Sequence, residues 1–436
     1  MHMYPSSPRK LGAHIAGAVL AGALAITALA GCSSPSSPGA SGTSDELLVW
    51  VDATRQPAAE AYAKSHSDEK ITIVTVDGSK LESKLALAAR DAKNAPDVVF
   101  TPNGQAIEFA TELGFSADLT DKVSDTVKDG FGATLSACSQ DGKLYCLPQD
   151  VSTQMLWYNQ KLFAQFGYEI PATWSDYAAL AARVATEHPG YVVGSCGDGF
   201  CPNVYYRGSD CVGYDVDGKD VSITLATDKN CTRVTEMLNP LVAGKSVATL
   251  SPFDPDMATL GAESKVLMLP GFVWYGSVLF KDTFKNQDGE IAAAPLPTWP
   301  DGKKGTGAAV GGQWVVNSKT ASTDRAVKLI EWMTTDDATL AQAATFPAYE
   351  PAAASWVKTA VSSGFYASDP TDTFLAARSD VSGDLYAPAF NILDPFTNAV
   401  APKLKEGASL ESLIPAWQPA VQQAATDAGY TATIAE

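Results

Sequence analysis

The chain has 436 residues, with 49 acidic and 31 basic side chains and a formal net charge of −18 at pH 7. Such a negative balance argues against nucleic acid and against an anionic membrane surface as partners. The length is sufficient for two domains.

The first residues have the composition of an export signal. Arg9 and Lys10 precede an apolar run that ends in the sequence LAGC, and a linker rich in Ser, Pro and Gly follows. A membrane-spanning helix is the rival interpretation, since about 20 apolar residues suffice to cross a bilayer. The segment resembles a bacterial lipoprotein signal at 1–31 and a flexible linker at 32–44, which implies cleavage before Cys32 and lipidation of its thiol.

Three short β-branched segments, at 46–51, 71–76 and 96–100, alternate with helical patterns. This alternation predicts an α/β fold with a parallel sheet covered by helices on both faces. Ligands in such folds bind beyond the carboxyl ends of the strands. The polar residues expected at those ends are Asp52, Asp77, Asn103 and Gln105.

Further along the chain, a capped amphipathic helix is predicted at 173–184 and another helix at 322–335. Strands are predicted at 291–297 and 308–316. The segment 194–231 shows little periodicity and is rich in Gly, Asp and Cys, so we expect a disulfide-linked excursion there.

Six cysteines remain after Cys32 is set aside, and an even number in an exported chain indicates disulfides. Their clustering favours pairing between sequence neighbours. The expected pairs are Cys138 with Cys146, Cys196 with Cys201, and Cys211 with Cys231. A zinc site in the sequence CGDGFC is the rival interpretation, but its spacing does not match structural zinc ribbons.

Enzyme motifs are scarce. Residues 32–436 contain only His66 and His188, and neither has a second histidine at metal-ligand spacing. This composition argues against a zinc hydrolase and a Ser-His-Asp triad, and no metal or cofactor is expected. With so many acidic residues, the sequence does not exclude a catalytic pair of carboxylates. A secreted carbohydrate-active enzyme, either a glycoside hydrolase or a lyase, is therefore the alternative function.

Several motifs occur in a fixed order along most of residues 45–345. They are GKLYCLP at 142–148, YNQKLF at 158–163, PATWSDYAAL at 171–180, ESKVLMLPGFVW at 263–274 and PLPTWPDGKKGTGAAVGGQWVV at 295–316. Together they resemble the extracellular solute-binding proteins of ABC importers, family 1. The resemblance implies a binding protein without enzymatic activity.

The resemblance also implies a two-lobed, periplasmic-binding-protein-like α/β fold with a hinge and a ligand cleft between the lobes. The expected lobes are 45–150 plus 309–345, and 151–308 plus 346–436, with the hinge at 147–153 and near Gly311. The implied ligand is a carbohydrate, and the implied partner is an ABC permease. The protein would be a monomer, lipid-anchored on the extracellular face of the bacterial cell membrane.

The resemblance places Trp274 in the cleft, where an indole can pack on the apolar C–H face of a sugar ring. Tyr275 is equally compatible with the cleft and with the core. Asp150 and Ser152 on the hinge strand are expected to reach ligand hydroxyls. Gln313 and Trp314, on a predicted strand near the cleft, complete the expected binding residues. A metal chelate or small anion is a further possible ligand, which the net charge disfavours.

Overall fold

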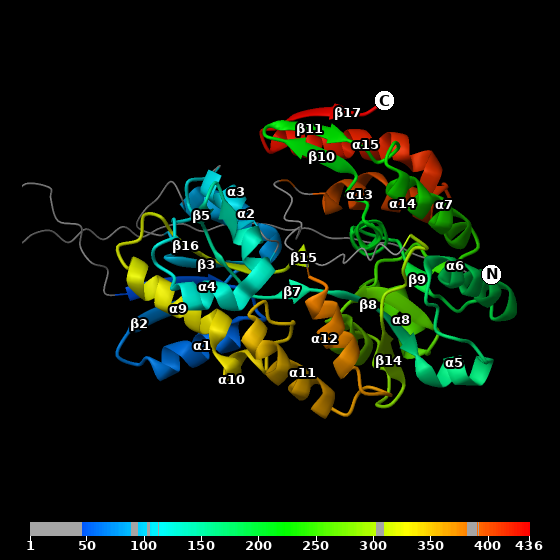
Figure 1. Cartoon of the computed structure of the whole chain (residues 1–436), viewed down its shortest axis with the longest axis horizontal. Helices are drawn as coiled ribbons and strands as arrows, with labels where there is room; N and C mark the ends of the chain where they lie inside the picture. The colour runs from blue at the N-terminus through cyan, green and yellow to red at the C-terminus, as the bar shows by residue number, and fades with distance from the viewer. Residues whose placement is uncertain are drawn as a thin grey trace, which may run out of the picture. The chain divides into compact units, whose positions relative to one another are not determined.

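The computed structural model describes residues 46–88, 95–102, 105–111, 113–301, 309–381, 390 and 392–436. Figure 1 shows the arrangement of the elements. The strands are β1 (Glu46–Val51), β2 (Lys70–Thr75), β3 (Val98–Thr101), β4 (Ser139–Gln140), β5 (Lys143–Leu144), β6 (Leu147–Pro148), β7 (Val151–Ser152), β8 (Gln154–Asn159), β9 (Gly194–Ser195), β10 (Tyr214–Asp217), β11 (Asp220–Ile223), β12 (Val247–Ala248), β13 (Met268–Phe272), β14 (Ile291–Ala294), β15 (Ala309–Val310), β16 (Gln313–Val316) and β17 (Thr431–Ile434).

The helices follow the same chain-order numbering. They are α1 (Gln56–Ser65), α2 (Gly78–Ala88), α3 (Ala106–Thr111), α4 (Asp125–Phe131), α5 (Gln160–Phe166), α6 (Trp174–Glu187), α7 (Lys229–Ala243), α8 (Pro255–Ala262), α9 (Thr323–Thr335), α10 (Asp337–Leu340), α11 (Ala353–Ser362), α12 (Thr371–Ser379), α13 (Leu393–Ala399), α14 (Ala401–Lys405) and α15 (Leu410–Asp427). Among the described residues, three segments are 3₁₀-helices, namely η1 (Gly132–Cys138), η3 (Arg207–Ser209) and η5 (Glu350–Ala352). Two other described segments are π-helices, namely η2 (Pro202–Tyr206) and η4 (Tyr275–Thr283).

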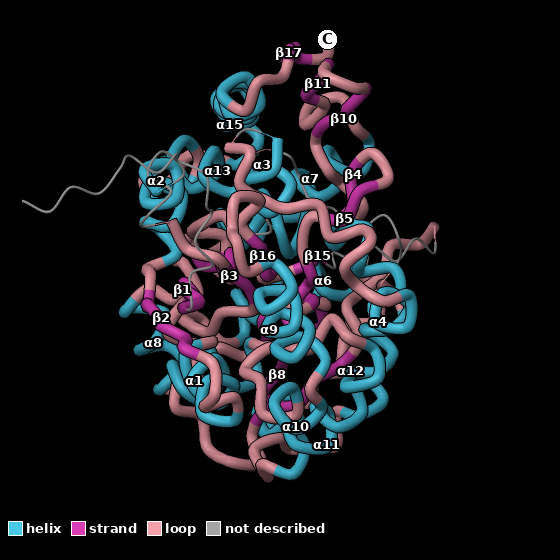
Figure 2. Tube along the Cα trace, turned by 90° about the vertical axis from the view of Figure 1, so that its left-hand side faces the viewer, coloured by secondary structure: helices cyan, strands magenta, loops and turns pink. Residues whose placement is uncertain are grey.

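The first sheet has the strand order β2-β1-β3-β16-β6. Strands β2, β1 and β3 are parallel, as the sequence predicts, whereas β16 runs antiparallel to β3 and the sheet is therefore mixed. Figures 1 and 2 show α2 and α3 on one side of this sheet and α1 and α9 on the other. Helices thus cover both faces, which explains why its central strands are apolar throughout.

A second sheet has the order β13-β8-β14 and is antiparallel. A third joins the β10–β11 hairpin to β17 near the end of the chain, with β11 and β17 parallel. The segment 194–231, predicted as an irregular excursion, therefore contains a hairpin that pairs with residues about two hundred positions away.

The buried residues form two large hydrophobic cores. The first core draws its members from 47–147 and 314–348, and the second from 155–294 and 346–425. The chain crosses between the cores in three regions, near residues 148–154, 295–313 and 334–352, and in the last of these Phe346 belongs to the second core and Ala348 to the first. The first two regions coincide with the places where the sequence predicts a hinge, 147–153 and Gly311. No helix in the described part of the chain has both the length and the apolar character needed to span a bilayer.

Local sequence signals place several helices correctly. Helix α6 begins at a capping box, in which the Thr173 hydroxyl and the Asp176 carboxylate each bond the other's backbone amide. Helix α9 buries Ala326, Leu329 and Met333 on one face, at the spacing that the sequence predicts.

Candidate functional site

The three chain crossings are joined by backbone hydrogen bonds. The Gln149 amide donates to the Gly312 carbonyl at 2.8 Å, and the Val151 amide donates to the Phe346 carbonyl at 2.9 Å. The Ala348 amide returns a bond to the Gln149 carbonyl at 3.1 Å. The segment between β6 and β7 thus lies between the other two crossings, which links all three in one hinge.

Asp150 lies at the centre of this hinge and is only 3% exposed. One carboxylate oxygen accepts a bond from the Gly312 amide at 2.7 Å, and the other accepts from the Arg55 guanidinium and the Thr345 hydroxyl. A Cβ atom on Gly311 would lie 2.0 Å from the same carboxylate. In this conformation Asp150 therefore bonds hinge residues, and only glycine fits beside it.

Arg55 is a site residue that the sequence did not single out. It directly precedes α1, and its guanidinium reaches the Asp52 carboxylate at 3.2 Å as well as Asp150. The guanidinium carbon also lies 4.4 Å from the centre of the Phe100 ring. The only signal in the sequence for this residue was a basic side chain three residues after Asp52, just beyond the end of a predicted strand. The predicted residue Asp52 is half-buried and holds Arg55 in place through its side chain.

The second-sheet strand β13 ends beside the hinge. Ser152 is half-buried and pairs with Ala309 in the short β7–β15 ladder. One residue further, the Thr153 carbonyl accepts a bond from the Val273 amide at 2.9 Å. Trp274 follows Val273 directly, so the hinge strand and the end of β13 bring Ser152 and Trp274 into the same region.

Trp274 is half-buried and lies among phenyl rings. Its indole stacks on Phe272, with ring centroids 5.6 Å apart and an interplanar angle of 9°. Phe253 is nearly parallel to it at 6.0 Å and is 40% exposed, while Phe200 meets it edge-on at 6.0 Å. We call Phe200, Phe253, Phe272 and Trp274 the aromatic wall. It combines a supported indole with exposed apolar surface, which suits the C–H face of a sugar.

A carboxylate adjoins the aromatic wall. One Asp198 oxygen accepts a bond from the Phe200 amide at 2.9 Å, and the other accepts from the Ser251 hydroxyl. Burial raises the pKa of Asp198 above its usual value of 3.8, and the two hydrogen bonds oppose this shift. Within the described ranges no cation forms an ion pair with Asp198. A partly buried carboxylate beside an aromatic surface can accept hydrogen bonds from ligand hydroxyls.

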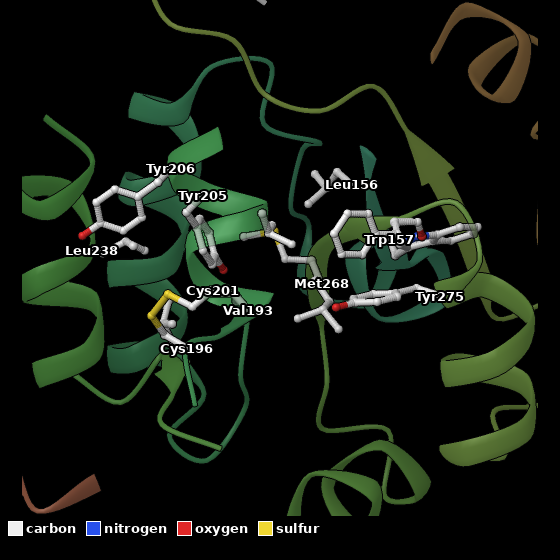
Figure 3. Packing of buried hydrophobic residues seen from close by; sticks show 14 of the residues in the cluster. Leu156, Trp157, Val193, Cys196, Cys201, Tyr205, Tyr206, Leu238, Met268 and Tyr275 are labelled. Carbon is white, nitrogen blue, oxygen red and sulfur yellow. A yellow bond between two sulfur atoms is a disulfide. The ribbon is translucent and has the colours of Figure 1, made fainter. Parts of the chain in front are cut away.

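Tyr275 belongs to the second core. It is 1% exposed, and Figure 3 shows it alongside Trp157 in the packed interior. A Cβ atom at Gly271 would lie 2.2 Å from its ring, so a glycine is needed for the ring to pack there. Burial raises the pKa of Tyr275 well above 10.0, with a smaller contribution from the charge of Asp198. Of the two interpretations of Tyr275, its burial favours the core.

Gln313 and Trp314 are both 0% exposed. The Gln313 side chain accepts a bond from the Ala106 amide at 2.9 Å and donates to the Ala137 carbonyl at 3.1 Å. The Trp314 indole N–H donates to the Gln149 side chain. Because β16 is a central strand, these side chains face helices and loops of the first core. They therefore do not form part of the candidate site.

Two predicted site residues follow β3. Gln105 is half-buried and accepts a bond from the Thr101 hydroxyl at 3.4 Å. Asn103 lies outside the described residues, as does Cys32.

The three predicted disulfides are confirmed. The structure joins Cys138 to Cys146, Cys196 to Cys201 and Cys211 to Cys231, with Cα atoms 5.0, 4.5 and 5.0 Å apart. The zinc interpretation of CGDGFC is wrong, because its two cysteines bond each other.

Comparison with known proteins gives a family match and curated relatives. A model of the bacterial extracellular solute-binding proteins matches residues 49–340. The maltodextrin-binding protein of Bacillus subtilis is 25% identical over 335 residues, which cover 73% of this chain and 76% of that protein. An arabinooligosaccharide-binding protein of Halalkalibacterium halodurans is 24% identical over 274 residues, which cover 59% of this chain and 60% of that protein. The match therefore spans less than two thirds of the second relative.

Solved structures support the fold. The galacto-N-biose-/lacto-N-biose I-binding protein of the ABC transporter from Bifidobacterium longum has a TM-score of 0.74 at 19% identity, covering 91% of this chain and 100% of that chain. The predicted two-lobed α/β fold with a hinge and an interlobe cleft is thus confirmed. The matched family consists of binding proteins, which confirms that the chain is not an enzyme. From the extent of the family match, we conclude that this chain belongs to the bacterial extracellular solute-binding proteins.

Proposed function

We propose that this protein is the substrate-binding lipoprotein of an ABC importer. It captures a carbohydrate, either a monosaccharide or an oligosaccharide, between its two lobes and delivers it to the permease.

The observation that carries this proposal is the half-buried Trp274 indole. It lies next to the hinge, is supported on one side by Phe272 and adjoins the Asp198 carboxylate through Phe200. Sugar recognition requires an apolar surface for the ring and charged or polar acceptors for the hydroxyls. Trp274 and Asp198 supply one of each.

The names of the relatives agree with a carbohydrate ligand. The curated relatives include binding proteins for arabinooligosaccharides, maltodextrin and galactooligosaccharides. Solved neighbours contain lacto-N-biose, β-1,6-galactobiose and maltotetraose. These ligands differ in linkage and length, so they support the class of ligand but not one sugar.

The proposed lobes are 45–150 plus 309–345, and 151–308 plus 346–436. The two separate cores and the hydrogen-bonded crossings at the hinge support this division. Closure about the hinge would bring Asp52 and Gln105 of the first lobe toward Ser152, Asp198 and Trp274. In the closed state, Asn103 and Asp150 would contact the ligand as well.

The proposed location is the extracellular face of the bacterial cell membrane, with an acylated Cys32 as anchor. The lipoprotein-like signal at 1–31 supports this location, and two relatives from Streptococcus pneumoniae are named as solute-binding lipoproteins. In this proposal the protein is a monomer that meets the permease subunits at the membrane.

A carbohydrate panel tests the proposal. It contains maltotetraose, β-1,6-galactobiose, lacto-N-biose, diacetylchitobiose and an arabinooligosaccharide, each added to the mature protein during thermal unfolding. A sugar at 100 times its dissociation constant adds about 2.7 kcal/mol to the free energy of unfolding and raises the melting temperature. A panel that leaves the melting temperature unchanged would count against carbohydrate binding.

Mass spectrometry of the recovered sugar separates the binding protein from the alternative of a secreted carbohydrate-active enzyme. The sugar should return intact after prolonged incubation. A cleaved or eliminated sugar would establish the enzyme instead.

A further inference from the structure

The Cys196–Cys201 disulfide closes a loop of only four intervening residues at the candidate site. Cys196 directly follows β9, and Cys201 directly precedes η2. Both cysteines are buried, and Figure 3 shows their bond within the second core. The two ends of loop 197–200 are therefore covalently joined to each other and buried in the core.

This loop carries two groups of the candidate site. Phe200 contacts Trp274, Phe253 and Phe272, with ring centroids 5.9–6.0 Å away. Asp198 bonds the Phe200 amide and the Ser251 hydroxyl, and the Ser251 hydroxyl oxygen accepts a bond from the Phe253 amide at 3.2 Å. The position of loop 197–200 thus determines where Phe200 and Asp198 lie, and it also affects Phe253.

The other two residues of the loop are glycines that allow close backbone packing. A Cβ atom on Gly197 would lie 2.1 Å from the Leu250 carbonyl carbon, and one on Gly199 would lie 2.7 Å from Leu393. Glycine also gives the unrestrained chain its greatest conformational freedom. Without a covalent restraint, the loop would have to lose that freedom when ligand binds, and the affinity would fall.

We infer that the Cys196–Cys201 disulfide is a positioning device for the ligand site, holding Phe200 and Asp198 in their binding arrangement before the ligand arrives. This inference rests on the proposed carbohydrate site. It implies that loss of this disulfide reduces affinity more than it reduces stability.

The chain offers a matched control in the Cys211–Cys231 disulfide. Both of its cysteines are buried, and their sequence separation is 20, against 5 for Cys196–Cys201. A disulfide that closes a longer loop restricts the unfolded chain more. Removal of the control disulfide should therefore lower the melting temperature further while leaving the site intact.

The test compares the double variant Cys196→Ala/Cys201→Ala with Cys211→Ala/Cys231→Ala. Calorimetry uses the panel sugar that binds the unaltered protein most tightly. The first variant should lose about tenfold or more in affinity, since two site side chains become mobile. The control should stay within about twofold of the unaltered protein, within the usual scatter of distant substitutions. Equal affinities in the two variants would overturn the inference, and so would a first variant that fails to fold.

Hydrogen exchange of the Gly199 and Phe200 amides provides a readout that needs no sugar. Both amides are hydrogen-bonded, to the Thr397 hydroxyl and to Asp198. They should exchange about tenfold faster or more in the first variant but not in the control, because a loosened loop opens more often. Unchanged exchange would overturn the inference. If no panel sugar binds the unaltered protein while this exchange difference appears, the proposed function fails, and only the restraint of loop 197–200 by the disulfide is supported.

Discussion

Trp274 and Asp198 come from distant parts of the chain and meet on either side of Phe200. The indole offers a flat apolar surface, and the carboxylate offers a charged hydrogen-bond acceptor that burial has partly stripped of water. Neither group alone distinguishes a sugar from another ligand. Together they suit a sugar, because a pyranose presents apolar C–H bonds and hydroxyls on the same ring.

Replacement of Trp274 by alanine should weaken sugar binding. Truncation of a buried aromatic anchor typically removes about 2–4 kcal/mol of binding free energy, or roughly 30- to 1,000-fold in affinity. Trp332→Ala is the matched control, because Trp332 is also half-buried but packs on Tyr62 in the first core. Calorimetry should show lost affinity for Trp274→Ala and near-normal affinity with a lower melting temperature for Trp332→Ala. The opposite pattern would return Trp274 to a structural role.

Asp198→Asn should weaken binding at neutral pH and alter its pH dependence. The raised pKa of Asp198 means that the carboxylate takes up a proton at a higher pH than a free aspartate. Affinity of the unaltered protein should therefore fall on acidification, because the charged acceptor is lost. The Asp198→Asn protein should bind about tenfold or more weakly at pH 7, since hydrogen bonds to charged groups contribute about 1.5–3 kcal/mol. A titration series showing the same pH profile for both proteins would exclude this role.

The same raised pKa makes the pH dependence of folding stability opposite to that of sugar affinity. A carboxyl whose pKa is higher in the folded state takes up more protons when folded, so its charged form destabilises the folded state above that pKa. Protonated Asp198 therefore contributes to folding stability at low pH. This contribution is lost as the pH rises from the unfolded-state pKa through the folded-state pKa. Affinity and stability therefore respond oppositely to pH at Asp198.

At the level of elements, local patterns in the sequence predict helices and strands well. The cap of α6, the buried face of α9 and the first three parallel strands follow from short-range spacing. Long-range pairing is different, because the sequence does not show which strand lies next to which. Strand β16 inserts between β3 and β6, and this central position buries Trp314, which was predicted near the cleft.

The candidate site was also only partly predictable. Trp274 was found through a motif, and the hinge segment through another. Phe200 and Asp198 were missed because their role depends on contacts with Ser251 and Trp274, which are more than fifty residues away. The available signal was the sequence DGF enclosed by two cysteines, in a segment that had no helical or strand periodicity.

The hinge elements depend on the ion pair between Arg55 and Asp150. Arg55→Ala leaves a buried carboxylate without its cation and should lower the free energy of unfolding by about 3–5 kcal/mol. Added Asp150→Asn should recover part of this loss, because the amide carries no charge. Arg325→Ala is the control, since its Glu69 partner also pairs with Lys328 and the loss should stay below about 1 kcal/mol. Equal losses in denaturant titrations of Arg55→Ala and Arg325→Ala would contradict this account of the hinge.

For the whole molecule, the expected anchor lies in the N-terminal part of the chain. Cys32→Ser should abolish acylation and release a folded protein from the membrane, because the linker at 32–44 has no apolar pattern. Fractionation and mass spectrometry of the mature N-terminus check this. A variant that stays in the membrane fraction would indicate that the apolar run before Cys32 is a true membrane helix.

Capture of a carbohydrate between two lobes is the central claim, and small-angle X-ray scattering with and without the tightest-binding panel sugar tests it most directly. Closure about the hinge that links the three crossings should reduce the radius of gyration at saturation. The Trp274→Ala protein at the same sugar concentration should keep the larger, ligand-free value. A radius of gyration that does not change when the unaltered protein is saturated would contradict capture between the lobes.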